Sequence, residues 1–593
     1  MDVEGNGRCL DAFTVAFSQA GEGEKTGWYV STLELQLASR EFCRACRSVT
    51  TLHVTVDKRT PRGLWHRDSR TPRGKRSKKA RSSRVPIVRA LRLTWMLPIE
   101  VLLNGADVEL WKRSHCLVIR GSVSSAFPKS VVWPDSLKRL KLDSVLEMGM
   151  ESMSWPPCLE YFVFGDGFDQ PIIGAAWPSS LKGLQFGYYF DQAVTGVEWP
   201  ASLQNLSFGY WFNQAIAGVV WPASLQQIVF GSKFNRPITR VKWPCSLQQI
   251  RLGGDFNQSI TGIVWPGSLQ QLSFGREFNQ PIAGVVWPAS LQQLSFGLQF
   301  NQPIDDLVVW PASLQQLSFA GRFNQPIAGV EWPASLQQLS LGSRFNQHIA
   351  AVVWPSSLQQ LSFGGMFNQL IDAGVVWPAS LQQLSLGRSF NRPIEGVLWP
   401  ASLQELSFGR KFNQRIAGVV WPASLQKLSF ARNFNKCIAG VAWPASLQQL
   451  TFGVLFNQNI IGVVWPAFLE QLSFGQEFDQ PIDAGVVWPA FLQQLTFGQQ
   501  FNQPIAEVLW PASLRELSFG REFDQAITGV EWPASLQKLS FGDTFNQTIV
   551  GVVWPASLQQ IVFGSTFVQP IDGVVWPTSM RSLTIGGGGN QLP

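Results

Sequence analysis

Two cysteines and two histidines near the N-terminus are the residues whose types and spacing come nearest to a metal site. Cys43 and Cys46 form a C-x-x-C pair, and His53 and His66 follow it. Thiolate and imidazole are the ligands that tetrahedral Zn²⁺ prefers. However, the spacing of these four residues matches no strong zinc template, and a single C-x-x-C on a helix-forming stretch is usually incidental. We therefore predict no metal and no other cofactor.

Catalysis needs irregular residues brought together, whereas this sequence supplies regular ones. The serines recur at two fixed positions of a repeated phrase, where structure accounts for them, and only one of the four histidines, His348, lies inside the regular repeats. No Ser-His-Asp set, carboxylate pair or phosphate-binding G-x-x-x-x-G-K-[ST] motif stands out. We predict that the protein is not an enzyme.

The positive charge of the chain belongs to one short segment. Residues 58–84 hold twelve Lys and Arg against one acid, and without them the net charge of +7 becomes −4. A nucleic-acid-binding function therefore does not follow from the overall charge and is disfavoured. The run "GKRSKKAR" (74–81) is typical of a nuclear-import signal or of phosphate contacts, with a solvated linker as the alternative. Its candidate import residues are Lys75, Arg76, Lys78, Lys79 and Arg81.

Cysteine usage and hydropathy bear on the compartment. The seven cysteines are odd in number and recur at no fixed repeat position, which favours reduced thiols over a disulfide framework. The first residues carry acids where a signal peptide needs bases, and no run of eighteen apolar residues exists. We expect a cytoplasmic protein, with the nucleus as the alternative, and no membrane partner.

A repeated phrase dominates the sequence. Trp-Pro pairs begin at 133 and recur to 576; of the twenty intervals, seventeen are 22 residues long and three are 23. The extra residue of each long interval follows the Ile, as in "PIDAGVVW" (481–488), so that stretch is predicted to be a loop. A fixed period of this length is typical of a solenoid, in which each unit needs its neighbours to bury its apolar residues.

One stretch of each unit has the pattern of a strand. When positions are counted from Trp as zero, apolar residues recur at +4, +7, +9, +13, +17 and +20. The piece "LQQLSFG" alternates Leu, Ser and Phe, which predicts a short strand with Leu and Phe inward. Pro at +1 and often at +16 confines the strand to about +5 to +10, and Gly at +10 is expected to allow a turn. The Trp column is interpreted as a packed spine with each indole N–H bonded to a neighbouring loop, rather than as a sugar-binding platform.

The Leu-x-x-Leu-x-Phe core resembles leucine-rich repeats, and "WPASLQQLSFG..FNQPI..GVV" is more specifically similar to FNIP repeats over about residues 133–585. The resemblance implies a β-rich solenoid of stacked 22-residue coils with one short parallel strand per coil. It also implies a structural ladder of the Asn side chains in "FNQ", for example Asn279, Asn301, Asn324 and Asn413. The family is built of interaction modules, so the resemblance implies no reaction.

The rest of the chain is less regular. "SVTTLHV" (48–54), "PIVRALRL" (86–93) and "HCLVIRG" (115–121) echo the strand pattern, and "STLELQLASREFCRACR" (31–47) could form an amphipathic helix. We expect five parts: an N-terminal head or cap (1–56), a basic, disordered insertion (57–85), degenerate capping coils (86–132), the repeat array (133–585) and a Gly-rich tail (586–593).

Comparison of the units indicates where a site would lie. The strand positions hardly change from unit to unit, whereas +11 and +12 vary, so specificity is expected at that edge. One stretch there is strongly basic: Arg388, Arg392, Arg410, Lys411, Arg415, Arg432 and Lys436. We predict a non-catalytic protein-interaction scaffold whose unidentified partner docks an acidic segment here. The alternative is that these residues form a solvated ridge without a binding function. A glycan-binding or structural array is the alternative function.

Overall fold

The computed structural model describes residues 51–56, 90–95, 115–119, 133–142, 150 and 155–586. These residues form a parallel β-solenoid of about 20 coils, about 22 residues apart, with one strand in each coil, as the sequence predicted. The chain divides into two compact units, residues 1–170 with 176–181, and residues 171–175 with 182–593. Each unit is described by itself.

The described residues of the first unit form five strands that pair in chain order and in parallel. Its strands are β1 (Thr51–Val56), β2 (Ala90–Trp95), β3 (Cys116–Ile119), β4 (Arg139–Leu142) and β5 (Tyr161–Phe164). Three of them fall in or next to the stretches that echo the strand pattern. A strand is therefore present well before the first Trp-Pro pair of the regular phrase.

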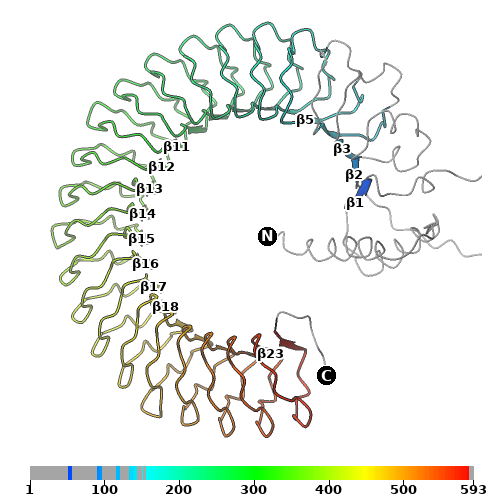
Figure 1. Cartoon of the computed structure of the whole chain (residues 1–593). Coiled ribbons are helices and arrows are strands. Elements are labelled where there is room, and N and C mark those ends of the chain that lie inside the picture. The colour runs from blue at the N-terminus through cyan, green and yellow to red at the C-terminus, as the bar shows by residue number, and fades with distance from the viewer. Residues whose placement is uncertain are drawn as a thin grey trace, which may run out of the picture. The chain divides into compact units, whose positions relative to one another are not determined.

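The described residues of the second unit form nineteen strands, β6 to β24, each hydrogen-bonded in parallel to the next. In Figure 1 the strands of this unit lie along the inner side of its curved array, and the turns lie outside. The strands are β6 (Gly183–Gln185), β7 (Asn205–Ser207), β8 (Gln227–Val229), β9 (Gln249–Arg251), β10 (Gln271–Ser273), β11 (Gln293–Phe296), β12 (Gln316–Phe319), β13 (Gln338–Ser340), β14 (Gln360–Ser362), β15 (Gln383–Ser385), β16 (Glu405–Phe408), β17 (Lys427–Phe430), β18 (Gln449–Thr451), β19 (Gln471–Ser473), β20 (Gln494–Thr496), β21 (Glu516–Ser518), β22 (Lys538–Ser540), β23 (Gln560–Phe563) and β24 (Ser582–Ile585).

Register follows the repeat, so identical side chains stack on one another. Gln271 pairs with Gln293, Leu272 with Leu294 and Ser273 with Ser295, and the same match recurs along the unit. The strands span positions +6 to +8, or +9 at most, which is shorter than the stretch predicted from the prolines. The buried column positions are those that the periodicity selected: Leu at +4 and +7, Phe at +9 and +13, Ile at +17 and Val at +20.

In all coils but the last, glycine at +10 has no positive φ and serves close packing between coils. A Cβ added to Gly297 would lie 1.7 Å from the carbonyl oxygen of Gly275, the equivalent glycine of the preceding coil. Apart from Gly321 and Gly586, the left-handed glycines occur at +19, in the turn opposite the strand; Gly284 has φ of 72° there. The turn predicted after the strand is present at +11 and +12, for example at 276–277, and a Cβ at +10 is resisted because this position faces the backbone of the neighbouring coil. The left-handed conformation is needed elsewhere, at +19.

Side-chain ladders join the coils where no strand does. The backbone N–H of Asn301 donates to Oδ1 of Asn279 at 2.9 Å, and the N–H of Asn324 donates to Oδ1 of Asn301 at 2.8 Å. A second ladder runs through Ser at +3: the hydroxyl of Ser290 donates to the carbonyl oxygen of Leu269 at 2.7 Å. Both ladders satisfy backbone groups that would otherwise be buried without a partner.

The Trp column is buried, but its predicted hydrogen bonds are wrong. Trp265 and Trp287 are about 7–8% exposed, and their indole Nε1 atoms have no hydrogen-bond partner among the described residues. The rings stack on the equivalent rings of adjacent coils, as for Trp221 and Trp243 with centroids 6.4 Å apart, and meet Phe at +9 edge to face. Ring packing therefore holds the column, because aromatic contacts add to the burial of such large side chains.

The three long intervals differ from the others only in a turn. Asp305, Asp372 and Asp483 begin the widened turns, and Oδ1 of each accepts a hydrogen bond from the backbone N–H two residues later at 2.9–3.2 Å. The strands on either side keep the common register.

Several sequence predictions fall outside the described residues. They concern the C-x-x-C pair, the possible helix 31–47, the basic insertion 57–85 with its candidate import run, and all but the first residue of the tail 586–593.

Candidate functional site

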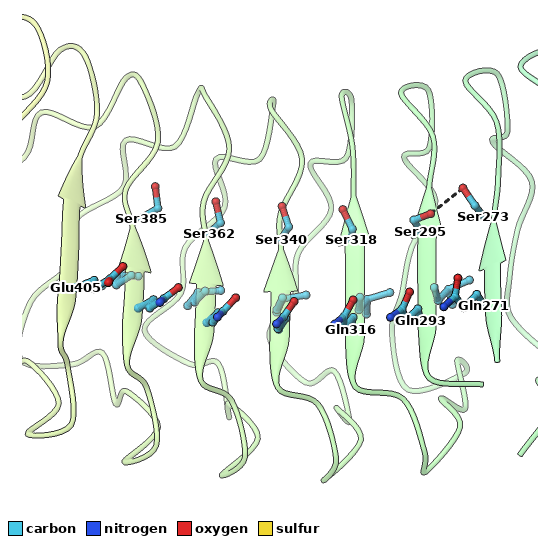
Figure 2. A pocket seen from close by; sticks show the side chains of 18 of the residues that line it. Gln271, Ser273, Gln293, Ser295, Gln316, Ser318, Ser340, Ser362, Ser385 and Glu405 are labelled. Carbon is cyan, nitrogen blue, oxygen red and sulfur yellow. Dashed lines mark hydrogen bonds between the residues drawn. The ribbon is translucent and has the colours of Figure 1, made fainter. Parts of the chain in front are cut away.

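The strand side of the second unit carries a wide, shallow groove of about 720 Å³ that crosses strands β8 to β18. Its lining repeats three residues per strand, Gln at +6, Leu at +7 and Ser at +8, with the Leu buried beneath. Figure 2 shows Gln271, Gln293 and Gln316 on successive strands with the Ser side chains beyond them, and Ser295 donating to Ser273 at 2.9 Å.

This groove is uniform and almost uncharged. Its charged lining residues are Arg251, Glu405 and Lys427, and the last two neutralise each other through an ion pair of 2.8 Å. Amide and hydroxyl groups spaced at one strand interval offer hydrogen bonds but little to distinguish one ligand from another. The groove is therefore a poor place for specificity.

The variable positions +11 and +12 lie at the edge where the strands end, which we call the strand-end edge. Backbone hydrogen bonds connect these positions from coil to coil: the N–H of Lys411 donates to the carbonyl of Arg388, and the N–H of Asn433 donates to that of Arg410, both at 2.9 Å. The next bond, from Leu455 to the carbonyl of Arg432, measures 2.8 Å. The three arginines at +11 are therefore held in consecutive coils, as their spacing predicted.

We call the seven basic residues predicted there the basic ridge. Six of the seven are exposed and Lys436 is half-buried. Among the described residues none of the seven forms an ion pair within 4 Å. Nε of Arg392 donates to the backbone carbonyl of Asn368 at 2.9 Å, which fixes that side chain on the preceding coil. The arrangement gives one sign of charge, fixed in backbone position, with guanidinium groups free to reach an anion.

A second feature of the same edge was not selected from the sequence. Tyr188 and Tyr189 occupy +11 and +12 of one coil, and Tyr210 and Trp211 occupy them in the next. The rings of Tyr188 and Tyr210 stack with centroids 4.7 Å apart, and Tyr210 meets Trp211 edge to face at 5.6 Å. We call these four residues the aromatic edge. A compositional signal was available, because three of the chain's five tyrosines gather here.

One lysine borders the aromatic edge. Nζ of Lys233 lies 5.8 Å from the ring centroid of Tyr210 and 5.7 Å from that of Trp211, within reach of cation–π attraction. Its hydrogen bond of 2.9 Å to Oδ2 of Asp255, together with the charge of that carboxylate, raises the pKa of Lys233. The lysine therefore keeps its charge beside the rings.

Nothing in the described part of the chain has the form of a catalytic or metal centre. No group of three or more His, Cys, Asp or Glu side chains there could hold a metal ion. No helix among those residues is long and apolar enough to cross a membrane. The candidate features of the described surface are suited to recognition: the almost uncharged groove, the basic ridge and the aromatic edge.

The family model of the FNIP repeat matches seven segments of the chain: residues 168–211, 234–277, 278–321, 323–366, 367–411, 412–454 and 545–588. These segments make up more than half of the sequence. The chain belongs to the FNIP repeat family. This result confirms the FNIP resemblance inferred from the sequence. Folds of this kind are typically non-catalytic.

The chain is also similar to solved structures. This FNIP repeat chain is 36% identical to the protein of "The crystal structure of CroV588 a novel circular LRR protein structure", with a TM-score of 0.70 over 84% of this chain and 78% of that one. The Drosophila Toll–Spatzle complex also matches, at 12% identity and a TM-score of 0.45 over 76% of this chain and 64% of that one. The search of curated protein sequences returned no match. A leucine-rich-repeat-like array of this kind indicates a protein-interaction scaffold.

Proposed function

We propose that the FNIP repeat array is a non-catalytic scaffold whose basic ridge docks an acidic segment of a partner protein. The observation that carries the proposal is the placement of Arg388, Arg410 and Arg432 in three consecutive coils, joined by backbone hydrogen bonds at that edge. The rest of the edge mixes polar, acidic, apolar and basic residues, and its basic residues occupy at most two consecutive coils, as at Arg322 and Arg344.

Electrostatics favour an anionic partner at this place. Equivalent positions of adjacent coils are roughly 5 Å apart, so the ridge charges repel one another, although water and salt keep the cost small. A carboxylate-rich segment removes that repulsion and accepts charge-assisted, bidentate hydrogen bonds from the guanidinium groups. Two apolar residues beside the ridge, Met366 and Leu370, are more than half exposed and add contact area for the same partner.

Binding of a labelled peptide of twelve glutamates tests the ridge directly. We expect the intact protein to bind it with a Kd that rises steeply with salt. Replacing Arg388, Arg410, Lys411 and Arg432 with Gln should raise the Kd at least about tenfold and flatten the salt dependence, because most of the attraction is lost.

The matched control removes the same charge from other coils of the same edge. Arg276, Arg322, Arg344 and Arg521 are exposed at +11 or +12 outside the ridge, and their replacement with Gln should change the Kd less than about threefold. Equal losses for the two variants, with circular dichroism unchanged, would reduce the ridge to general positive charge. Deletion of 57–85 should leave binding in place, which separates the ridge from the basic insertion.

Glycan binding is the second candidate, and the aromatic edge is the observation that favours it. The buried Trp column cannot serve as a sugar platform, but Tyr188, Tyr189 and Trp211 expose between 41% and 56% of their surface. Exposed aromatic faces stack on the apolar faces of sugars. We expect Tyr189→Ala with Trp211→Ala to abolish retention on immobilised oligosaccharides if this function holds; retention that survives the pair of substitutions argues against it.

A further inference from the structure

The residue before each Trp forms an exposed apolar column along the second unit. In one coil Val285 is 4% exposed, Val286 is 79% exposed and Trp287 is 8% exposed, so the extended segment turns one residue inward, the next outward and the next inward again. The segment lies between the outer turn at 283–284 and the turn at 289–290 that precedes the strand. The outward residue therefore lies on the flank of the array, away from the groove.

We call this set the pre-tryptophan column. Its thirteen Val and Leu residues are between 65% and 82% exposed: Val220, Val264, Val286, Val309, Val353, Val376, Leu398, Val420, Val464, Val487, Leu509, Val553 and Val575. Five members of the column are not large and apolar: Glu198, Lys242, Glu331, Ala442 and Glu531. Even with these interruptions, an aligned apolar row of this length is far more than the scattered exposed side chains of an ordinary surface.

The period of the column restricts what can cover it. Its side chains recur once per coil over eighteen coils, and a protein partner matches them coil by coil only if its own apolar side chains repeat with the same interval. Another copy of this array has that interval by construction. A two-fold axis between two copies makes the contact isologous, because both copies use the same surface. The first coil of one copy then lies opposite the last coil of the other, the second opposite the second to last, and so on.

The charged exceptions select one register of such a pair. We consider the antiparallel register in which all eighteen coils from Glu198 to Val575 face the same coils of the second copy in reverse order. This register places Lys242 opposite Glu531 of the second copy, and Glu531 opposite Lys242 of the second copy. The same register places Glu331 opposite the small Ala442. Glu198 lies opposite Val575. The other six combinations place large apolar residues opposite each other: Val220 with Val553, Val264 with Leu509, Val286 with Val487, Val309 with Val464, Val353 with Val420, and Val376 with Leu398.

We propose that the pre-tryptophan column is a self-association surface, through which two copies of this chain pair antiparallel about a two-fold axis between the coils of Val376 and Leu398. Curvature of the array within its own plane does not prevent this contact. The two-fold axis runs along the radius of the curved array, between the coils of Val376 and Leu398. Rotation about this axis places the flank of the second copy on the flank of the first, with paired coils at the same distance from the centre of curvature. The groove and the strand-end edge stay outside the contact, so the pair presents two basic ridges.

The area is sufficient for a stable pair. Full burial of an aliphatic side chain removes roughly 60–120 Å² of apolar surface. Twelve such side chains per copy, mostly exposed, therefore contribute on the order of 1,000 Å², compared with about 800 Å² per partner in a standard interface.

Sedimentation equilibrium of the full chain tests the pairing. At about 10 µM we expect twice the chain mass of 66.0 kDa, and the same result in 1 M NaCl because apolar burial dominates. Lys242→Glu places a carboxylate opposite Glu531, and Glu531→Lys places an amine opposite Lys242. Each single variant should weaken association at least about tenfold, since the repulsion occurs twice per pair.

The double variant, Lys242→Glu with Glu531→Lys, should restore association to within about threefold of the wild type, because it exchanges the two signs. Leu298→Glu is the matched control: it adds a charge at the exposed strand-end edge and should leave the mass unchanged. A monomer at 10 µM, or association that ignores both single reversals, overturns the proposal. Failure of the double variant to recover overturns the register, and binding of the monomer to lipid vesicles would assign the column to a membrane surface instead.

Discussion

Phe412→Ala is expected to lower the free energy of unfolding by about 3–5 kcal/mol. Phe412 is fully buried at position +13 and stacks on the equivalent rings Phe390 and Phe434 at 6.1 and 6.0 Å, with Phe408 at 4.1 Å. Truncation removes contacts with four rings in three coils, since Phe430 also stacks on Phe412, and leaves a cavity that a close-packed stack cannot close. Because each coil is stabilised by its neighbours, we expect the coils on either side of Phe412 to unfold as two separate cooperative segments.

Equilibrium urea unfolding followed by circular dichroism gives the loss, and hydrogen exchange of strands β15 to β17 locates it. Phe491→Ala is the matched control. Phe491 is 54% exposed at +3, where most coils have Ser, so its loss should cost less than about 1 kcal/mol. Equal destabilisation by the two substitutions would mean that the +13 column is not the core of the stack.

Asn413→Ala is expected to destabilise the array by about 1–3 kcal/mol, the cost of leaving a part-buried donor without its acceptor. Oδ1 of Asn413 accepts a hydrogen bond of 2.9 Å from the backbone N–H of Asn435 in the next coil. Alanine cannot accept this bond, so the loop of the next coil loses the contact that fixes it.

Asn413→Asp separates the hydrogen bond from other effects of the side chain. The chain already uses Asp in this ladder: Asp479 accepts the N–H of Asn502 at 2.9 Å, and Asp191 accepts that of Asn213 at 2.7 Å. The Asp variant should therefore unfold within about 0.5 kcal/mol of the wild type. If Asp destabilises as much as Ala, acceptance by Oδ1 is not what holds the loops together.

Periodicity predicted the parts of the fold that follow from one coil. The alternation in "LQQLSFG" identified the strand, and insertions after Ile identified the loop, because both patterns depend on side-chain direction along the chain. Relations between coils were harder to predict. The close approach of Gly297 to Gly275 and the unpaired indole of Trp265 depend on the distance between stacked coils, which a single phrase does not encode.

The candidate site shows the same division. The positions of Arg388, Arg410 and Arg432 in the repeat were enough to place them side by side, because equivalent positions stack. The aromatic edge and the pre-tryptophan column were not selected, because the sequence shows positions +11 and +12 only as variable, and nothing in it marks Val286 as exposed beside the buried Val285 and Trp287. Only the observed exposure of these side chains separates surface from core.

The central claim is that the basic ridge recruits an acidic protein partner. The most direct measurement is affinity capture from a lysate on three immobilised forms: the wild type, the ridge variant with Arg388, Arg410, Lys411 and Arg432 replaced by Gln, and the matched control variant. Mass spectrometry then identifies what each retains. Our account predicts a protein with an acidic segment that the wild type and the control retain and the ridge variant loses. Equal retention by all three forms, or retention of glycans without protein, would contradict it.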